Sequence, residues 1–184
     1  MAGRWRRLDS EPLGDYRIFS LRRERYESPR NGHTIGAVVL DAPDWVNVIA
    51  LSDGAECVMI RQFRFGTDSI TLEIPGGMID AGEVPLEAAV RELREETGYT
   101  AERWTALGSV APNPAFERNR LHTFLAEGCR RVGELQQDES EDIEVVAVPL
   151  AEIDGLIARG NIEHALVIIA FHKLQLLRRG LTLL

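Results

Sequence analysis

Three glutamates stand at a spacing that suits metal chemistry. Glu92, Glu95 and Glu96 occupy positions i, i+3 and i+4, which lie on one side of an α-helix because successive residues turn by about 100°. Carboxylates held this close repel one another unless a cation lies among them. Mg²⁺ and Mn²⁺ prefer oxygen ligands of this kind. The spacing therefore indicates a divalent metal site, and a solvated acidic helix face is the alternative that these three residues alone leave open.

The residues around the glutamates predict a helix between two loops. Pro85 suits the first turn of a helix, and Gly98 suits the position after its last turn. The apolar side chains of this segment are expected to form a stripe beside the glutamates and to pack against the core. These residues are Leu86, Ala89, Val90 and Leu93.

The stretch from Gly77 to Tyr99 resembles the Nudix box, in which a glycine, a glutamate, an Arg-Glu pair, a Glu-Glu pair and a final glycine stand at fixed separations. The residues that match are Gly77, Glu83, Arg91, Glu92, Glu95, Glu96 and Gly98. Tyr99 departs from the pattern, because an aliphatic residue is usual there, and the difference concerns packing rather than chemistry. On this match the chain is identified as a member of the Nudix hydrolases. The resemblance implies an enzyme that hydrolyses pyrophosphate bonds.

Length and charge narrow the classes of partner. The chain of 184 residues is long enough for one domain with a sizeable core, or for a domain with a short N-terminal addition. Its net charge of −8 argues against nucleic acid or an anionic membrane as the main partner. A phosphate substrate stays compatible with that charge, because bound metal ions reverse the local sign.

Cysteine usage and hydropathy indicate a cytoplasmic protein. Cys57 and Cys129 lack metal-ligand spacing, so we expect buried or incidental thiols rather than a disulfide or a zinc site. The charged start of the chain is not followed by an apolar run, and no apolar stretch reaches transmembrane length. We therefore expect a soluble protein without a signal peptide.

Hydrophobic patterns along the chain predict an α/β fold. Helices are expected in the box, from 149 or 150 to about 160, and over 162–177. Strands are expected over 16–26, 34–40, 45–51, 56–63, 71–75, 104–110, 121–125 and 143–148. The result is a mixed sheet flanked by helices, in keeping with the α/β/α sandwich that the Nudix resemblance implies. We divide the chain into an N-terminal β-hairpin extension, residues 1–40, and a Nudix hydrolase domain, residues 41–184.

Two features outside the box resemble one branch of the family. Pro114 follows the box at the interval of the proline marker of ADP-ribose pyrophosphatases and related nucleoside diphosphate sugar hydrolases, although a turn proline explains it as well. The N-terminal strands resemble the extension through which that branch forms intertwined dimers. The resemblance thus implies a homodimer, and a solvent-facing hairpin is the alternative.

The acidic run over 138–142 resembles the loop that carries the catalytic base in ADP-ribose pyrophosphatases. On that match Glu139 is the candidate base and Glu141 a further metal ligand. An exposed acidic loop is the alternative. The box favours the catalytic interpretation, because the chemistry needs a carboxylate opposite the metal-binding helix.

Arginines are the candidates for holding the substrate. Arg61 and Arg64 resemble the position from which this branch contacts phosphate or the terminal sugar. Arg118 and Arg120 are candidates for similar contacts, because guanidinium groups match phosphate oxygens in pairs. Arg25 lies in a strand whose arginines either reach a dimer partner's substrate or form a solvated edge.

The resemblance implies the following mechanism. Mg²⁺, with Mn²⁺ as a possible substitute, is bound by Glu92 and Glu96, by Glu95 as a shared or second ligand, and by the Gly76 carbonyl. Arg91 orients these carboxylates, and Glu139 takes a proton from the attacking water. The expected substrate is a nucleoside diphosphate sugar such as ADP-ribose or GDP-mannose, cleaved to a nucleoside monophosphate and a sugar phosphate. A dinucleoside polyphosphate or NADH hydrolase and a non-catalytic nucleotide-sugar sensor are the alternatives.

Overall fold

The computed structural model describes residues 3–53, 55–134 and 142–183. It divides into two compact units, which are described separately below. Unit 1 comprises Met1–Asp44 with Ala111–Arg120, and unit 2 comprises Trp45–Val110 with Leu121–Leu184. Among the described residues, no helix is both long and apolar enough to cross a membrane.

Unit 2 is built on a mixed sheet. Strand β10 runs parallel to β4, and the other pairs are antiparallel. The order is β11-β5-β4-β10-β8, with β6 on β5, β7 on β4 and β9 on β10. The strands are β4 (Trp45–Ser52), β5 (Glu56–Arg64), β6 (Ser69–Glu73), β7 (Gly76–Met78), β8 (Tyr99–Thr100), β9 (Arg103–Val110), β10 (Leu121–Arg131) and β11 (Ile143–Pro149).

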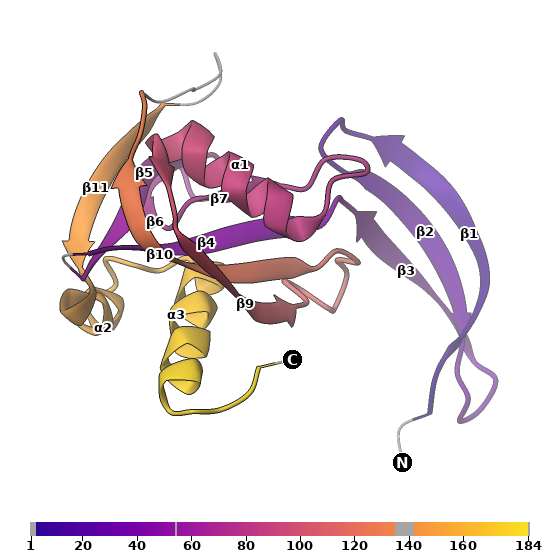
Figure 1. Cartoon of the computed structure of the whole chain (residues 1–184). Coiled ribbons are helices and arrows are strands. Elements are labelled where there is room, and N and C mark those ends of the chain that lie inside the picture. The colour runs from indigo at the N-terminus through magenta and orange to yellow at the C-terminus, as the bar shows by residue number, and fades with distance from the viewer. Residues whose placement is uncertain (1–2, 54, 135–141, 184) are drawn as a thin grey trace. The chain divides into compact units, whose positions relative to one another are not determined.

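Helices cover both faces of this sheet. Helix α1 lies on one face and α3 on the other (Figure 1). Side chains alternate along β4, so that Val48 packs with the core residues of α1 and Ile49 with those of α3. The helical elements are α1 (Pro85–Thr97), the 3₁₀ turn η1 (Leu150–Glu152), α2 (Ile153–Ala158) and α3 (Ala165–Arg178). The predicted α/β/α sandwich is confirmed.

The buried side of α1 differs from the predicted apolar stripe. Ala89 and Leu93 are fully buried, as expected, whereas Leu86 and Val90 are exposed. The helix is rotated so that its buried positions are Ala88, Ala89, Glu92, Leu93, Glu96 and Thr97. The buried face is therefore shifted away from Leu86 and Val90, toward the neighbouring stripe that carries Glu92 and Glu96.

The end of α1 depends on a glycine. Gly98 has a left-handed backbone (φ 72°), and its N–H donates to the Arg94 carbonyl at 2.8 Å. A Cβ atom at this position would lie 2.4 Å from the Gly133 carbonyl oxygen. Both the backbone angle and the close neighbour therefore require glycine here.

Unit 1 contains a three-stranded antiparallel sheet in the order β1-β2-β3. Its strands are β1 (Arg6–Asp15), β2 (Ser20–Glu27) and β3 (Thr34–Asp41). The hairpin formed by β2 and β3 is the predicted one, and β1 is an additional strand that the apolar pattern did not indicate. The strand predicted from residue 16 begins only at Ser20, because residues 16–19 form a turn in which Tyr16 N–H donates to the Phe19 carbonyl.

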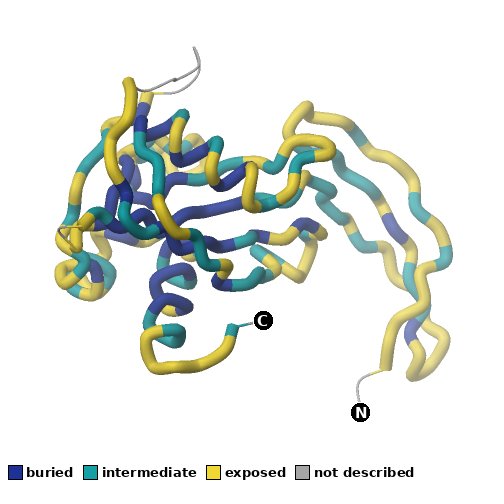
Figure 2. Tube along the Cα trace, viewed as in Figure 1, coloured by how far each residue is buried: buried dark blue, intermediate teal, exposed yellow. Residues whose placement is uncertain are grey.

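The sheet of unit 1 carries mostly exposed and intermediate residues, in contrast to the buried central strands of unit 2 (Figure 2). Residues 111–120 join this unit through the backbone of Leu40, whose N–H donates to the Phe116 carbonyl at 2.8 Å and whose carbonyl accepts from Arg118 N–H at 3.1 Å. The division into residues 1–40 and 41–184 stays a prediction.

The two cysteines are buried and unpaired, as expected from the sequence. Burial raises the pKa of the Cys57 thiol to about 12 and that of Cys129 to about 11. Both thiols are therefore protonated packing residues of unit 2.

Candidate active site

Two glycines bring the carboxylates of α1 against strand β7. Gly76 N–H donates to Glu96 Oε2 at 2.8 Å. A Cβ atom on Gly77 would lie 2.4 Å from Glu92 Oε1, and one on Gly76 would lie 2.2 Å from the Val46 carbonyl oxygen. Because neither position has room for a side chain, β7 fits between β4 and the two carboxylates. Glu92 and Glu96 therefore lie against consecutive residues of one strand.

The three glutamates differ in burial. Glu92 is 9% exposed and Glu96 is 3% exposed, whereas the side chain of Glu95 is 39% exposed. Burying a carboxylate is unfavourable unless charged or hydrogen-bonding groups compensate it. This arrangement excludes the simple alternative of a solvated acidic helix face for Glu92 and Glu96.

Arg91 connects the helix carboxylates to the preceding loop. Its Nη1 lies 2.7 Å from Glu92 Oε1 and 3.2 Å from Glu95 Oε2. Its Nε and Nη2 donate to the carboxylate of Glu83 at 3.0 and 2.9 Å, and Nη2 also donates to the Met78 carbonyl at 2.9 Å. The hydrogen bonds with Glu83 raise the pKa of Arg91 and lower that of Glu83. Arg91 is thus held in one orientation by four partners.

A second buried ion pair lies on strands β5 and β6. Arg64 Nε and Nη2 donate to the two carboxylate oxygens of Glu73, each at 2.7 Å. The Glu73 side chain is 4% exposed, and its Oε1 also accepts from Thr71 Oγ1 at 2.5 Å. Burial raises the pKa of Glu73, but the hydrogen bonds from Arg64 and Thr71 outweigh burial and lower it.

The Arg64–Glu73 pair interacts electrostatically with Glu96 of α1. Hydrogen bonds with Glu73 raise the pKa of Arg64 against the effect of burial, and the negative charge of Glu96 adds to the increase. On the other side, His164 Nε2 lies 3.9 Å from Glu73 Oε2. Glu73 was not predicted from the sequence. The available signal was an acidic residue between the apolar residues Leu72 and Ile74, shortly before Gly76.

The donor types suit a hard divalent cation. Carboxylates and the Gly76 carbonyl are oxygen ligands of the kind that Mg²⁺ and Mn²⁺ prefer. Within the described ranges, no three acidic, histidine or cysteine side chains already form a group able to hold a metal. Arg91 and the Gly76 N–H take up oxygens of these glutamates. A bound cation would therefore share or replace those contacts.

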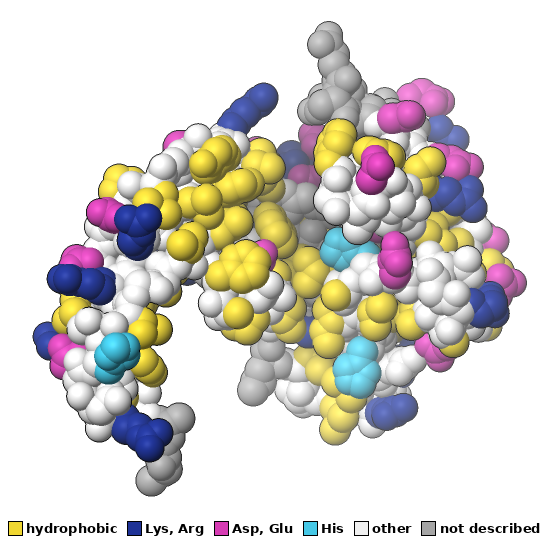
Figure 3. Space-filling view, turned by 180° about the vertical axis from the view of Figure 1, so that it is seen from behind, with side chains coloured by type: hydrophobic (Ala, Val, Ile, Leu, Met, Phe, Trp, Pro, Cys, Tyr) yellow, Lys and Arg dark blue, Asp and Glu magenta, His cyan; other side chains and the backbone are white. Residues whose placement is uncertain are grey.

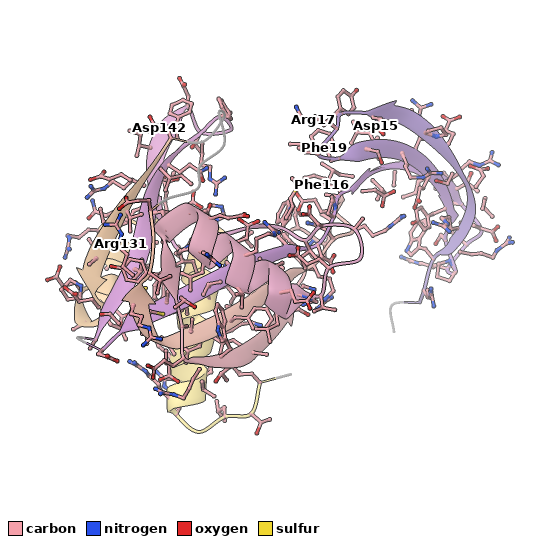
Figure 4. The ribbon with its side chains drawn as sticks, turned by 45° about the horizontal axis from the view of Figure 1, so that its top comes forward. Asp15, Arg17, Phe19, Phe116, Arg131 and Asp142 are labelled. Carbon is pink, nitrogen blue, oxygen red and sulfur yellow. The ribbon has the colours of Figure 1, made fainter. Side chains whose placement is uncertain are left out.

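The predicted base Glu139 and ligand Glu141 lie outside the described residues. The residues on either side of this acidic segment are described, and Figure 4 labels Arg131 before it and Asp142 after it. On one side, the N–H groups of Val132 and Gly133 donate to the Gly98 carbonyl at 2.9 and 3.3 Å. On the other side, Ile143 of β11 pairs with Gln62 of β5.

The remaining predicted residues are dispersed. Arg61 forms an exposed ion pair with Glu144 at 2.9 Å. Arg25, Pro114, Arg118 and Arg120 belong to unit 1. In that unit Arg25 pairs with Asp9 at 2.6 Å.

The other two predicted substrate arginines of unit 1 also have partners. Arg118 contacts Glu24 at 2.7 Å and Asp41 at 3.2 Å. The backbone N–H of Arg120 donates to Asp44 Oδ1 at 2.8 Å. The structure therefore brings together Gly76, Arg91, Glu92, Glu95 and Glu96, with Arg64 near Glu96.

Comparison with known proteins agrees with this geometry. The NUDIX domain family matches residues 42–171. An ADP-ribose pyrophosphatase of Bacillus subtilis is 33% identical over 170 residues, which are 92% of this chain and 91% of the relative. An ADP-ribose pyrophosphatase of Mycobacterium tuberculosis is 32% identical over 163 residues, which are 88% of this chain and 78% of the relative.

A solved structure shows the same fold. A crystal structure of an ADP compounds hydrolase superimposes with a TM-score of 0.86 at 26% sequence identity, covering 98% of this chain and 97% of that one. The family match covers the segment that contains the Arg91–Glu92–Glu95–Glu96 helix. The chain belongs to the Nudix hydrolases, in the branch of the ADP-ribose pyrophosphatases.

Proposed function

We propose that the chain hydrolyses the pyrophosphate bond of a nucleoside diphosphate sugar of the ADP-ribose type, giving a nucleoside monophosphate and a sugar phosphate. The observation that carries the proposal is the position of Glu92 and Glu96, buried against Gly76 and Gly77 at the end of β7. The names of the two bacterial relatives and of the superimposed structure support the ADP-ribose class.

The metal-binding part of the site consists of oxygen ligands from β7 and α1. Glu92 and Glu96 would hold Mg²⁺, or Mn²⁺ in its place, with Glu95 and the Gly76 carbonyl as further ligands. The bound metal supplies positive charge that stabilises the pyrophosphate oxygens and lowers the pKa of a water. Arg91 orients the ligands, because it contacts Glu92 and Glu95 while being held by Glu83 and the Met78 carbonyl.

Arg64 is the best-placed candidate for a phosphate contact in unit 2. Its side chain is 41% exposed. The contact with Glu73 uses Nε and Nη2, so Nη1 stays outside this pair and can donate to an anionic ligand. A guanidinium group held on one edge by a buried carboxylate is oriented before the substrate arrives, which reduces the entropy cost of binding. The other predicted substrate residues stay predictions, namely Arg25, Arg61, Pro114, Arg118 and Arg120.

Glu139 is proposed as the general base and Glu141 as a further metal ligand. The support comes from the two ends of the acidic segment. One end is attached to Gly98, two residues after Glu96, and the other enters β11 opposite Gln62, two residues before Arg64. Both anchoring points are therefore close in sequence to residues of the site.

A panel of substrates tests the proposal. ADP-ribose, GDP-mannose, a dinucleoside polyphosphate and NADH would be incubated with Mg²⁺ or with EDTA, and phosphate release would be measured with a coupled phosphatase. We expect cleavage of ADP-ribose that depends on Mg²⁺. Cleavage of only NADH or the dinucleoside polyphosphate would refute the nucleotide-sugar assignment.

A pair of variants on α1 separates metal binding from helix charge. Glu96→Gln keeps the size of the side chain and should reduce kcat/KM by at least about a hundredfold, since it removes a proposed metal ligand. Glu87→Gln removes an exposed charge from the first turn of the same helix and serves as the matched control, with an unchanged rate. Equal rates for both variants would contradict the role of Glu96.

A homodimer is the proposed assembly. Unit 1 exposes large apolar side chains, namely those of Leu13, Tyr16, Ile18, Ile35, Val38 and Phe116. Exposed apolar surface of this kind commonly marks a protein contact. Light scattering coupled to size-exclusion chromatography is expected to give twice the mass of one chain, and Val38→Glu should shift it toward the monomer.

A further inference from the structure

A cavity of about 950 Å³ lies within unit 1, and none of the unit 2 residues assigned above to hydrolysis lines it. It is lined by Arg4, Trp5, Arg6, Arg7, Tyr26 and Arg118. Four of these six residues are arginines and two are aromatic, and no carboxylate is among them. Figure 3 shows arginine side chains beside Asp and Glu side chains on unit 1.

One carboxylate that contacts the cavity residues is fully buried. Glu24 on β2 is 0% exposed. It accepts hydrogen bonds from Arg7 at 3.1 Å and from Arg118 at 2.7 Å. It also accepts from Tyr26 OH at 2.5 Å. One buried anion therefore fixes three residues of the cavity wall, from β1, β2 and the segment 111–120.

The guanidinium groups stay accessible from the cavity side. The side chains of Arg7 and Arg118 are 54% and 44% exposed, although both contact Glu24. Arg6 pairs with Glu27 at 2.5 Å and is itself more exposed. Each group presents several N–H donors in one plane, and a single carboxylate does not use them all.

The charges around the cavity leave a positive surplus. Its four arginines face three carboxylates, those of Glu24, Glu27 and Asp41. One positive charge is therefore uncompensated, and all three carboxylates contact arginines rather than line the cavity. An anion entering it would meet oriented donors and a net positive charge, and no carboxylate lines the cavity itself.

Trp5 gives the cavity a flat apolar surface as well. Its side chain is exposed, and Trp5 and Tyr26 are the aromatic lining residues. Bases stack on aromatic side chains, and guanidinium groups bind phosphate oxygens. A volume of about 950 Å³ lies in the range of small-molecule sites, about 300–1,000 Å³, and is far larger than a phosphate ion needs.

We propose that this cavity binds a nucleoside monophosphate, with the phosphate on the arginines and the base against Trp5. The overall charge of −8 disfavours a nucleic-acid strand as the ligand. The site shares no residue with the Glu92–Glu96 cluster, and the proposal does not depend on the reaction catalysed there. A monophosphate is also the product class expected from that reaction, so occupancy of the cavity would report the accumulation of product.

Calorimetric titration with AMP tests the site on the full-length chain in the presence of EDTA. We expect measurable binding that weakens as the salt concentration rises. Arg4→Ala and Trp5→Ala should each weaken AMP binding about tenfold, by loss of one charge-assisted contact or of base stacking. Arg30→Ala removes an exposed arginine of the same unit outside the cavity and serves as the control. This variant should bind AMP with the same affinity as the unaltered chain.

Three further arms make the outcome decisive. Inorganic phosphate and adenosine should each bind more weakly than AMP. Equal affinity for phosphate and AMP would refute the contribution of Trp5, and wild-type affinity in both Arg4→Ala and Trp5→Ala would refute the site. Glu96→Gln should bind AMP like the unaltered chain, and a loss there would assign the binding to unit 2 instead. Melting curves verify that each variant is folded.

Discussion

Arg64 and Glu73 form a bidentate pair, with Nε–Oε1 and Nη2–Oε2 distances of 2.7 Å each. The two residues lie on neighbouring antiparallel strands, β5 and β6. The carboxylate is almost completely buried, and the negative charge of Glu96 contributes to the raised pKa of the Arg64 guanidinium group. Two parallel hydrogen bonds between a guanidinium group and a carboxylate restrict the orientation of the guanidinium group more than a single hydrogen bond does. Glu73 therefore fixes the orientation of the Arg64 guanidinium group, which is proposed above to contact a phosphate.

Glu73→Gln is expected to raise KM more than it lowers kcat. The substitution keeps the shape of the side chain but replaces a charge-assisted pair by a weaker contact, a loss of about 2 kcal/mol or about thirtyfold in kcat/KM. Steady-state kinetics with ADP-ribose would measure both constants. Glu73→Asp should recover part of the loss because it restores the charge. Glu144→Gln removes the exposed partner of Arg61 and should have little effect, and equal effects of the two Gln variants would contradict the positioning role.

Gly77→Ala is expected to disturb metal binding more than folding. The new Cβ atom would lie 2.4 Å from Glu92 Oε1, so the carboxylate must move. We predict an increase of at least about tenfold in the Mg²⁺ concentration for half-maximal rate, in line with losses seen when metal-ligand surroundings are altered. Gly66→Ala is the control, since a Cβ there meets no atom within 4 Å. An unchanged Mg²⁺ requirement for Gly77→Ala would show that Glu92 is not a ligand.

Unit 1 is expected to lose stability in acid through Glu24. Burial raises the pKa of Glu24, but hydrogen bonds from Arg118 and Tyr26 dominate and lower it from 4.5 to about 2. Because the folded-state pKa is lower than that of the unfolded chain, the stabilising contribution is complete above pH 4.5. It decreases as the pH falls from 4.5 to about 2.

Glu24→Gln tests this dependence. At neutral pH the variant should be destabilised by about 3–5 kcal/mol, the range found when one partner of a buried ion pair is removed. Between pH 4.5 and 2 its melting temperature should fall less steeply than that of the unaltered chain. Parallel pH profiles for both proteins would mean that other carboxylates govern acid unfolding.

The orientation of α1 predicts different costs for two apolar substitutions. Leu93 is fully buried, so Leu93→Ala should reduce the free energy of unfolding by about 2–5 kcal/mol. Val90 is exposed, so Val90→Ser should change it by less than about 0.5 kcal/mol. Urea denaturation measures both values. A large loss for Val90→Ser would indicate that this position is covered in an assembly.

The helix with its glutamates was predictable from sequence because its information is local. Pro85, Gly98 and the spacing of Glu92, Glu95 and Glu96 specify one helix and one acidic face, and both occur in the structure. Which face of this helix is buried was harder to predict. Leu86 and Val90 are apolar but exposed, because Glu92 and Glu96 are turned inward against the glycines of β7.

Contacts between distant segments were not predictable in the same way. Strand β1 has arginines, aspartates, a proline and a glycine instead of alternating apolar residues, because a sheet with little buried surface does not need that alternation. In the sequence, Glu24 is one charged residue among the arginines of β2, and nothing next to it indicates that it is buried. Its burial depends on Arg118, which lies 94 residues away in the chain. Such partners become apparent only once the strands are paired.

The carbonyl of Gly98 accepts hydrogen bonds from both Val132 and Gly133. The residue that ends α1 therefore also fixes where the chain leaves β10, while Ile143 is fixed by its pairing with Gln62. Between these two attachments, length and composition can change during evolution without displacing the carboxylate helix. Changes in that segment would alter the proposed base Glu139 and leave the helix that carries Glu92, Glu95 and Glu96 in place.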